Sequence, residues 1–496
     1  MNKMARVSLF GLAVCLAGGA GLSKPRVVDE GTVIADVTLI SPERQAPWAH
    51  AAVVIREGRI AEVGADIVAG PHAKRIDGRG RFLVPGLIDS HVHVGHSAAL
   101  DDDAIAAHPE LWAAYRAQVP RAYLAFGFTS IVDLDLMPGD KAWFEGAPLR
   151  PGLYSCGRGI KVPGGYMAFD LPAPSAVNFP NLVYDPQEAA HWPPSLNPAD
   201  YTPERAVERA ADEGAICVKA FVESGFGTFN WPFLHTETLR QIRTAATNHK
   251  LILMVHANSV DSWRSAIDAH ADVIAHGLWV WPGDPADSVP PEIVRDVIAA
   301  AASRRVHVQP TIETVAGERA MFDPRLLDDP RLALALPRSV IAYLRSDEGV
   351  KARTALVDGY RKAAPPPGFE PLLAAGIERA RATFKIMLKD DVRLIFGSDT
   401  PGVEGFGNPP GLNGRLEMQN WADLGAPLSL ILRAATLENA TTLGLSRDLG
   451  SIEVGKRADL LLLRENPLAN VSAYDSIETI FLNGEPTARE TLRPRE

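Results

Sequence analysis

The middle of the chain alternates short apolar runs with longer stretches of helical periodicity. In PELWAAYRAQVPRAYLAFG and ETLRQIRTAATNHK the apolar residues follow a helical repeat, which predicts amphipathic helices. The short apolar runs predict strands at residues 86–93, 129–134, 152–156, 216–222, 251–256, 273–276, 306–311 and 394–399. Strands that alternate with helices in this way favour a parallel (β/α)8 barrel of the TIM type.

Both ends of the chain have a different pattern. Residues 31–85 contain short β-like runs such as AAVVIREGRIAEVG, in which Glu57 and Gly58 mark a hairpin turn. Residues 446–496 have the same character in IEVGKRADLLLL and IETIFLNGE. We therefore expect the two ends to form one composite β-sandwich domain and residues 86–445 to form the barrel. The 496 residues suffice for both, because such a barrel needs about 250.

Residues 1–20 predict a signal peptide. Lys3 and Arg6 precede a short apolar run that ends in small residues near Gly18–Ala20. The run is too short and too rich in glycine for a membrane span, and no other stretch is apolar enough to cross a bilayer. Cys15 lies in a poor lipoprotein box. We expect an exported, periplasmic protein, with a poorly packed N-terminus as the alternative.

Two cysteines, Cys156 and Cys217, remain beyond that segment. Each lies in an apolar strand-like run, so we expect buried thiols and no disulfide. The formal net charge of -10 and the lack of a Lys/Arg-rich run argue against a nucleic-acid partner. We expect a homo-oligomer that acts on a small molecule.

The stretch PGLIDSHVHVGH places polar side chains at the end of the first barrel strand. Asp89, His91 and His93 alternate and therefore share one strand face. Two imidazoles at this spacing can bind one zinc ion. Taken alone, a pair of hydrogen-bonded histidines explains them equally well. His96 lies beyond the strand and has no assigned role.

The other predicted strands carry matching side chains. His256, His276 and Asp399 lie at the ends of three strands, and Lys219 lies inside a fourth, apolar one. Burial of a lysine cation is costly, so either its ammonium group reaches solvent at the strand end or its amine is neutral. A neutral amine, which desolvation favours, can capture carbon dioxide as a carbamate.

The ordered set of His91, His93, Lys219, His256, His276 and Asp399 resembles the amidohydrolase superfamily, in its binuclear type with a carboxylated lysine. FLVPGLIDSHVH, AFGFTSIVDL, IFGSDT and LGSIEVGKRADLLLL resemble the prolidase-like, imidazolonepropionase-related branch. The resemblance covers nearly the whole chain beyond the signal peptide and implies a distorted (β/α)8 barrel with a composite β-sandwich.

The resemblance also implies roles for these residues. His91, His93 and Asp399 would bind one divalent metal ion, and His256 and His276 a second; we expect zinc. Lys219, as N6-carboxylysine, would bridge both ions. A metal-bridging hydroxide would attack the substrate, with Asp399 as the catalytic proton acceptor. Mononuclear relatives lack the lysine and carry an acid just after the fifth-strand histidine, where this chain has HANSV, so we favour two metal ions.

Substrate contacts are predicted from the loops at the strand ends. Trp279 and Trp281 follow His276, and Tyr166 stands in PGGYM where many relatives have GGH. Arg158 is a candidate partner for a substrate carboxylate. Packing at the barrel rim is the alternative for the aromatic residues, and a surface salt bridge is the alternative for Arg158. Residues 162–203, which lack periodicity, would lie over the barrel mouth.

These observations predict an exported metal-dependent hydrolase that cleaves an amide bond in a dipeptide or an N-acyl amino acid. The same metal ligands would serve a lactonase, an esterase or a phosphotriesterase. A non-catalytic binding protein on a degenerate barrel is a third hypothesis, and the intact ligand set argues against it.

Overall fold

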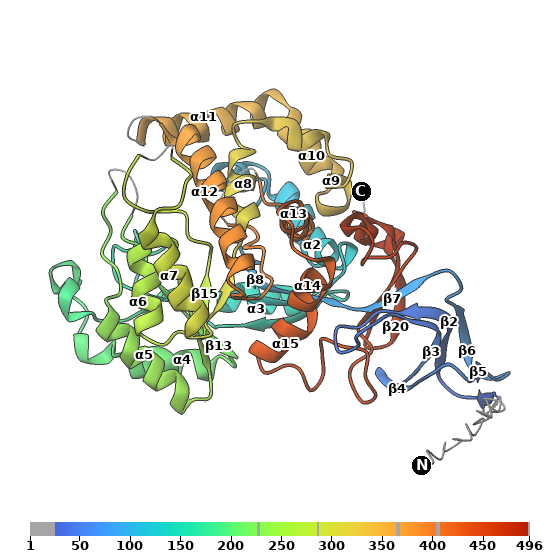
Figure 1. Ribbon diagram of the computed structural model, residues 1–496. Helices are drawn as coiled ribbons and strands as arrows, with labels where there is room; N and C mark the ends of the chain where they lie inside the picture. Colours follow the sequence, from blue (N-terminus) through green and yellow to red (C-terminus); the bar gives the residue numbers. More distant parts are fainter. Residues whose placement is uncertain (1–24, 226–228, 285–286, 364–367, 403–406, 495–496) are drawn as a thin grey trace, which may run out of the picture.

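A computed structural model of the protein describes residues 25–225, 229–284, 287–363, 368–402 and 407–494 (Figure 1). The expected signal peptide lies outside the described residues. Among the helices in the described ranges, none is both long and apolar enough to cross a membrane.

Within the described residues, eight parallel strands form the predicted barrel. The strands are β8 (Leu87–Val92), β9 (Phe128–Asp133), β10 (Gly152–Ser155), β13 (Cys217–Phe221), β14 (Ile252–His256), β15 (Val273–Ala275), β16 (His307–Gln309) and β17 (Arg393–Leu394). Each overlaps a predicted strand, but β17 shares only Leu394 with the predicted 394–399. The eight strands pair in sequence order within two sheets. The ring closes where Asp399 N donates to His91 O at 2.7 Å and His93 N donates to Thr400 O at 2.8 Å.

A disulfide joins the two sheets at their other junction. Ile216 N donates to Ser155 O at 2.9 Å, and beside this hydrogen bond Cys156 is bonded to Cys217. The expectation of two free thiols was therefore wrong. Both cysteines are fully buried, as predicted, but they lie on adjacent strands of the ring, which brings their sulfur atoms together.

Helices surround the barrel and connect its strands (Figure 1). They include α2 (Pro109–Ala125), α3 (Pro138–Glu145), α4 (Pro203–Asp212), α5 (Thr236–Asn248), α6 (Val260–Asp268), α7 (Glu292–Ser303), α12 (Phe369–Lys389), α13 (Leu412–Asp423), α14 (Leu428–Arg433) and α15 (Asn439–Thr442). The two periodic stretches quoted above form α2 and α5. In α5, Leu239, Ile242 and Ala246 are buried at helical spacing, which places one apolar face on the barrel.

A helical segment between β16 and β17 covers one end of the barrel. It contains α8 (Ile312–Arg319), α9 (Leu332–Ala335), α10 (Arg338–Arg345), α11 (Asp347–Ala363) and the start of α12. Helix α8 begins directly after Thr311, so it lies against the ends of the strands. Val315 on α8 and Phe369, Leu373 and Ile377 on α12 form a small apolar cluster of their own.

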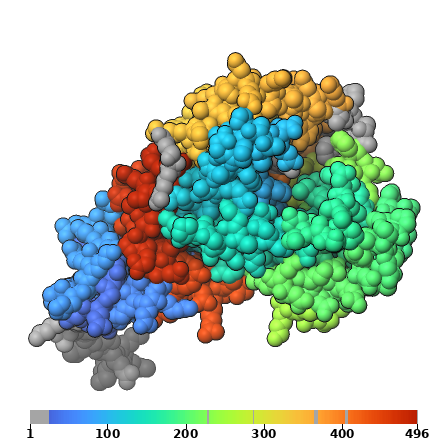
Figure 2. All heavy atoms as spheres, turned by 180° about the vertical axis from the view of Figure 1, so that it is seen from behind, coloured from blue at the N-terminus to red at the C-terminus, as the bar shows by residue number. Residues whose placement is uncertain are grey.

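Strands from both ends of the chain share one sheet beside the barrel (Figure 1). In Figure 2 the blue atoms of the N-terminal part accordingly lie next to the red atoms of the C-terminal part. Its strands are β2 (Thr32–Leu39), β3 (Trp48–Arg56), β4 (Arg59–Gly64), β6 (Lys74–Asp77), β7 (Phe82–Pro85), β18 (Leu460–Leu463), β19 (Ile477–Leu482) and β20 (Glu485–Ala488). Glu57 and Gly58 form the predicted hairpin turn with φ of 50° and 75°. Strand β18 pairs antiparallel with β7, which joins the C-terminal strands to the N-terminal ones.

Gly86 alone separates β7 from the first barrel strand β8. A Cβ atom at Gly86 would lie 2.0 Å from Thr129 Oγ1, so only glycine fits where β8 and β9 approach each other. The composite sheet therefore leads directly into the strand that carries His91.

Candidate metal centre

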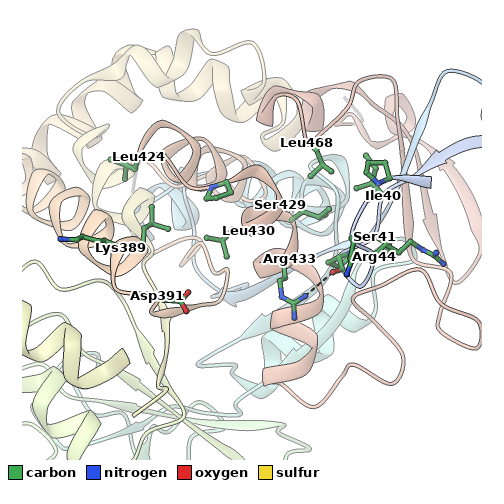
Figure 3. A pocket seen from close by; sticks show the side chains of 18 of the residues that line it. Ile40, Ser41, Arg44, Lys389, Asp391, Leu424, Ser429, Leu430, Arg433 and Leu468 are labelled. Carbon is green, nitrogen blue, oxygen red and sulfur yellow. Dashed lines mark hydrogen bonds between the residues drawn. The ribbon is translucent and has the colours of Figure 1, made fainter. Parts of the chain in front are cut away.

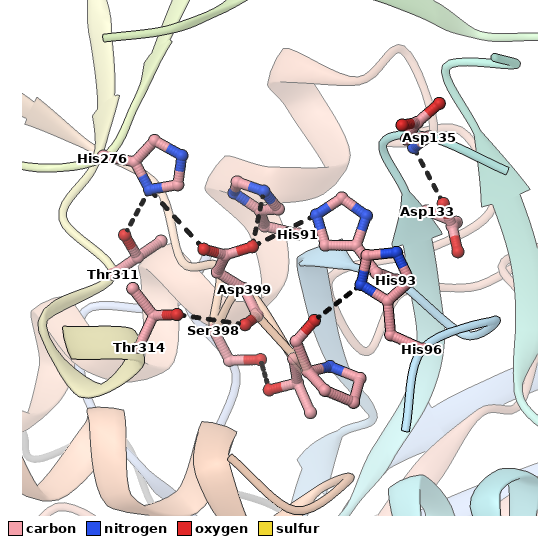
Figure 4. A network of polar contacts seen from close by, with 12 residues as sticks. His91, His93, His96, Asp133, Asp135, His276, Thr311, Thr314, Ser398 and Asp399 are labelled. Atoms are coloured by element: carbon pink, nitrogen blue, oxygen red, sulfur yellow. Dashed lines mark hydrogen bonds and ion pairs between the residues drawn. The ribbon is translucent and has the colours of Figure 1, made fainter. Parts of the chain in front are cut away.

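Three of the predicted ligands meet at the C-terminal ends of the barrel strands, and the ring of a fourth, His276, lies beside them (Figure 4). Asp399 Oδ1 lies 3.1 Å from His91 Nε2 and 3.2 Å from His93 Nε2, and Asp399 Oδ2 lies 3.8 Å from His276 Nδ1. The ligand atoms of His91, His93 and Asp399 all lie within 4.8 Å of one another. Nitrogen and carboxylate atoms at this separation are a fitting donor set for a divalent transition metal ion.

The backbone at two of these positions has a conformation that side chains rarely adopt. His276 has a φ of 84° and Asp399 a φ of 55°, although neither is glycine. Both residues follow the ends of barrel strands. Positive φ at such positions is common in functional sites, because surrounding contacts hold the backbone there.

His256 completes the group. Its ring centroid lies 4.4 Å from that of His276, whose own centroid lies 5.1 Å from that of His91. All of these histidines are buried. The five predicted histidine and aspartate ligands therefore form one continuous buried cluster at the strand ends.

Lys219 lies in the middle of β13 with 1% of its surface exposed. Its Nζ has no hydrogen-bond partner among the residues that the structure describes. Burial lowers the pKa of this lysine to about 7, so a large fraction of the amine is neutral near neutral pH. A buried amine without a partner, beside imidazoles and a carboxylate, fits the position of a carbamate that binds metal.

The pKa values of three of the four histidines also favour metal binding, whereas, against the effect of burial, contacts with Asp399 raise that of His93. Burial, and then the charge of Lys219, lower the pKa of His91 to about 3. Burial likewise lowers the pKa of His256 and, to a greater extent, that of His276. These three imidazoles are therefore neutral at pH 7, which is the form that binds metal ions. Burial opposes ionisation of Asp399, but its contacts with His91 and His93 hold its pKa well below the usual value.

Two supporting contacts were missed by the sequence reasoning. Glu223, in the loop after β13, has Oε2 at 3.3 Å from His256 Nε2 and accepts a hydrogen bond from Asn258 Nδ2 at 2.5 Å. Thr311 Oγ1 lies 2.9 Å from His276 Nδ1. A signal for Glu223 is present in the sequence, since an acid that directly follows an apolar strand with a buried lysine lies at the same barrel end.

The carboxylate of Asp89 does not take part in the cluster that His91 and His93 form with Asp399. Its Oδ1 accepts from Ser398 N at 2.9 Å and from His91 N at 3.2 Å, and its Oδ2 accepts from Ser398 Oγ at 2.5 Å. Strand β8 is irregular between Asp89 and Val92, which interrupts the strict alternation. Asp89 therefore ties β8 to the segment that carries Asp399.

Two of the four predicted substrate contacts lie at the site. The ring of Tyr166 is 4.8 Å from that of His256, and the ring of Trp279 is 5.8 Å from that of His276. Phe169 and Trp231 extend the aromatic surface around Tyr166. Part of the 162–203 segment therefore covers His256, as its place after the third strand indicates.

The other two predicted contacts are engaged elsewhere. Trp281 is 7% exposed and lies under the guanidinium group of Arg379, at 4.2 Å from the ring centroid. Arg158 Nε donates to Glu213 Oε1 at 2.7 Å, and its Nη1 donates to Phe179 O at 2.9 Å. These positions match the alternative interpretations, rim packing for Trp281 and a salt bridge for Arg158.

His96 stacks on His93, with ring centroids 5.1 Å apart. Its Nδ1 lies 3.4 Å from Pro401 O, and burial lowers its pKa to about 4. His96 therefore supports the ring of His93 from the side away from Asp399 (Figure 4).

A cavity of about 760 Å³ lies away from this centre, between the composite sheet and the helices (Figure 3). It is lined by apolar residues such as Ile40, Leu430 and Leu468 and by basic ones such as Arg44 and Arg433. None of the predicted metal ligands lines this cavity. We therefore place the chemistry at the strand ends, where the perturbed groups lie.

Comparison with known proteins agrees with the fold. The profile of the Amidohydrolase family matches residues 82–487. A crystal structure of a Xaa-Pro dipeptidase with bound methionine superposes with a TM-score of 0.63 at 20% identity, covering 92% of this chain and 99% of that one. At this identity the likeness speaks for the fold alone.

Curated relatives match over short stretches. Imidazolonepropionase of Ralstonia nicotianae is 51% identical over 49 residues, which are 9% of this chain and 12% of that protein. N-acyl-D-aspartate deacylase of Alcaligenes xylosoxydans is 41% identical over 83 residues, 16% of this chain and 14% of that protein. The chain thus matches only a small part of these relatives, whereas the family profile extends over most of its length. By that match, and with the barrel and the His–Asp cluster in place, the protein belongs to the amidohydrolase family.

Proposed function

We propose that the protein is a metal-dependent hydrolase that cleaves an amide bond of a small molecule. The observation that carries this proposal is the convergence of His91, His93 and Asp399 beside the unpaired amine of Lys219. The names of two similar proteins, a Xaa-Pro dipeptidase and an N-acyl-D-aspartate deacylase, favour an amide over an ester or a phosphotriester.

Two divalent metal ions, which we propose to be zinc, would fit this donor set. His91, His93 and Asp399 would hold one ion, and His256 and His276 the other. Bound there, the ions would lower the pKa of a water molecule and polarise the substrate carbonyl group. The neutral amine of Lys219 would add to carbon dioxide, form a carbamate and release one proton, and the carbamate would contact both ions.

Lys219 is better suited to this role than Lys161, the other buried lysine nearby. The Nζ atoms of both lie over the ring of Phe221, at 5.5 Å and 5.2 Å from its centroid. The ammonium group of Lys161, however, forms an ion pair with Asp135. Asp135 therefore occupies the amine of Lys161, whereas the amine of Lys219 has no hydrogen-bond partner among the described residues and burial favours its neutral form.

Asp399 would move the proton during hydrolysis. Its carboxylate lies among the ligand nitrogens, and its low pKa keeps it ionised, which is the form that can accept a proton. It would then return that proton to the amine that leaves. Tyr166 and Trp279 would contact an apolar or aromatic group of the substrate, because their rings lie against those of His256 and His276.

We propose further that the protein is exported. The Cys156–Cys217 disulfide supports this, because disulfides form and persist in oxidising compartments. N-terminal sequencing of protein from a periplasmic fraction checks it. We expect the chain to begin soon after residue 20, whereas an intact Met1 in the cytosolic fraction would contradict export.

A hydrolysis screen tests the proposed activity. Zinc-loaded protein is given dipeptides, N-acyl amino acids, lactones and a phosphotriester, with metal content measured in parallel. We expect turnover of amides with an apolar or aromatic group and two bound ions per chain. The Lys219→Ala variant should lose both the turnover and the bound ions. Turnover restricted to lactones or phosphotriesters would replace the amide proposal, and protein without bound metal or activity would contradict it.

A further inference from the structure

The two histidines proposed for the second metal ion are held through opposite ring nitrogens. His256 is held at Nε2, which lies 3.3 Å from Glu223 Oε2. His276 is held at Nδ1, which lies 2.9 Å from Thr311 Oγ1. A histidine that binds metal through one nitrogen is oriented by the contact at the other. The contacts therefore leave Nδ1 of His256 and Nε2 of His276 for the ion.

Glu223 is the centre of a buried cluster of donors. It is 6% exposed, and its Oε1 accepts a hydrogen bond from Gly225 N at 3.1 Å. Its Oε2 accepts from Asn258 Nδ2 at 2.5 Å and also faces the His256 ring. A carboxylate can only accept hydrogen bonds. The proton of His256 must therefore lie on Nε2, and Nδ1 keeps its lone pair.

The surrounding loops hold Glu223 in place. It lies four residues after Lys219, and Asn258 lies two residues after His256. The carbonyl oxygen of Asn258 accepts hydrogen bonds from Trp279 N at 3.0 Å and Val280 N at 2.9 Å. The contact between Glu223 and Asn258 thus connects the loops after β13, β14 and β15. Lys219 lies on β13, His256 ends β14, and His276 directly follows β15.

We propose that Glu223 is a positioning residue that fixes the tautomer of His256 and thereby controls occupancy of the second metal site. This inference rests on the proposed two-metal function. In this role Glu223 does not transfer a proton to the substrate. Glu223 acts through His256, and Asn258 acts through Glu223.

Glu223→Gln is the direct test. Glutamine has nearly the same shape, but its amide group can donate a hydrogen bond to His256 Nε2 and so favour the proton on Nδ1. That tautomer cannot bind metal through Nδ1. We expect the second zinc ion to bind about 10 to 100 times more weakly, the range typical of lost outer contacts, and the first ion to bind as before. Zinc titration against a chromophoric chelator measures both constants.

A second measurement reads the tautomer without metal or turnover. In metal-free protein labelled with ¹⁵N-histidine, the nitrogen shifts of His256 report which nitrogen carries the proton. The signal is assigned from its loss in His256→Ala. We expect protonated Nε2 in the natural chain and protonated Nδ1 in Glu223→Gln.

Controls separate this effect from a general loss of structure. Glu213→Gln removes a carboxylate that contacts Arg158 outside the centre, and it should bind both ions normally. Asn258→Ala keeps the carboxylate and removes one of its donors, so its effect on the second ion should be smaller. Thermal unfolding of the metal-free variants checks that each is folded.

The outcomes are distinct. Unchanged nitrogen shifts in Glu223→Gln would overturn the inference, and so would altered shifts with unchanged affinity for the second ion. If the natural chain binds only one ion, the proposed two-metal function fails, and the control of second-site occupancy fails with it. In that case the nitrogen shifts alone would show whether Glu223 still fixes the tautomer.

Discussion

At the scale of single residues, the chemistry depends on how each ionisable side chain is compensated. Lys161 has a carboxylate partner, and Lys219 has no hydrogen-bond partner among the described residues. Asp399 is surrounded by imidazoles, and Glu223 by three donors. The buried ionisable groups of this region therefore differ chiefly in the partners that they contact.

Asp399→Asn should remove the proton acceptor and keep most of the shape of the centre. We expect kcat to fall about 1,000-fold, within the range that general acid–base catalysis contributes, while most of the bound metal is retained. Steady-state kinetics and metal analysis of the same preparation check this. A variant with near-natural kcat would show that another group accepts the proton.

The pKa of Lys219 predicts how reconstitution depends on pH. Below a pKa of about 7 the amine is protonated and cannot attack carbon dioxide, and above it the amine is neutral. Activity regained by metal-free protein with zinc and bicarbonate should therefore rise between about pH 6 and pH 8. Reconstitution that is equally complete across this interval would contradict the carbamate. A parallel series without bicarbonate serves as the control.

The placement of the candidate ligands follows from the sequence, since strand periodicity and barrel symmetry bring strand ends together. The contacts that support these ligands do not follow from the sequence in the same way. The sequence places Glu223 at the barrel end, but no local pattern shows that it contacts His256, 33 positions later in the chain. Trp281 and Arg158 have the residue types of substrate contacts, but partners from distant segments decide where they point.

At the scale of elements, strands β10 and β13 are the junction between the two sheets of the barrel. All eight strands were predicted within a few residues, although β17 is shorter than expected. The disulfide was missed, yet a barrel in which consecutive strands are neighbours already places Cys156 next to the strand that contains Cys217. Strand order was therefore the signal that could have found it.

The double variant Cys156→Ala/Cys217→Ala should be less stable. The disulfide closes a loop between residues 61 positions apart, and its loss should lower the free energy of unfolding by about 4 kcal/mol. Denaturant unfolding without reductant measures this difference. An unchanged midpoint would show that strand pairing alone holds the junction. The natural protein, unfolded with and without reductant, is the matched comparison.

At the scale of the whole molecule, the proposed metal ions would connect β8, β13, β14, the end of β15 and the segment after β17. Removal of metal with a chelator should therefore lower the unfolding temperature by about 5 °C or more, because ligands that bind only the folded state stabilise it. Scanning calorimetry before and after chelation, and after zinc is restored, checks this. An unchanged unfolding temperature would contradict a centre shared by these strands.

The composite sheet also limits when during its synthesis the chain can complete its fold. Strand β7, which leads through Gly86 into the strand of His91, pairs with β18, more than 370 residues later in the chain. A nascent chain that ends before residue 460 leaves that edge of β7 without its partner. The sheet beside the first ligand strand can therefore be completed only after the ribosome has made nearly the whole polypeptide.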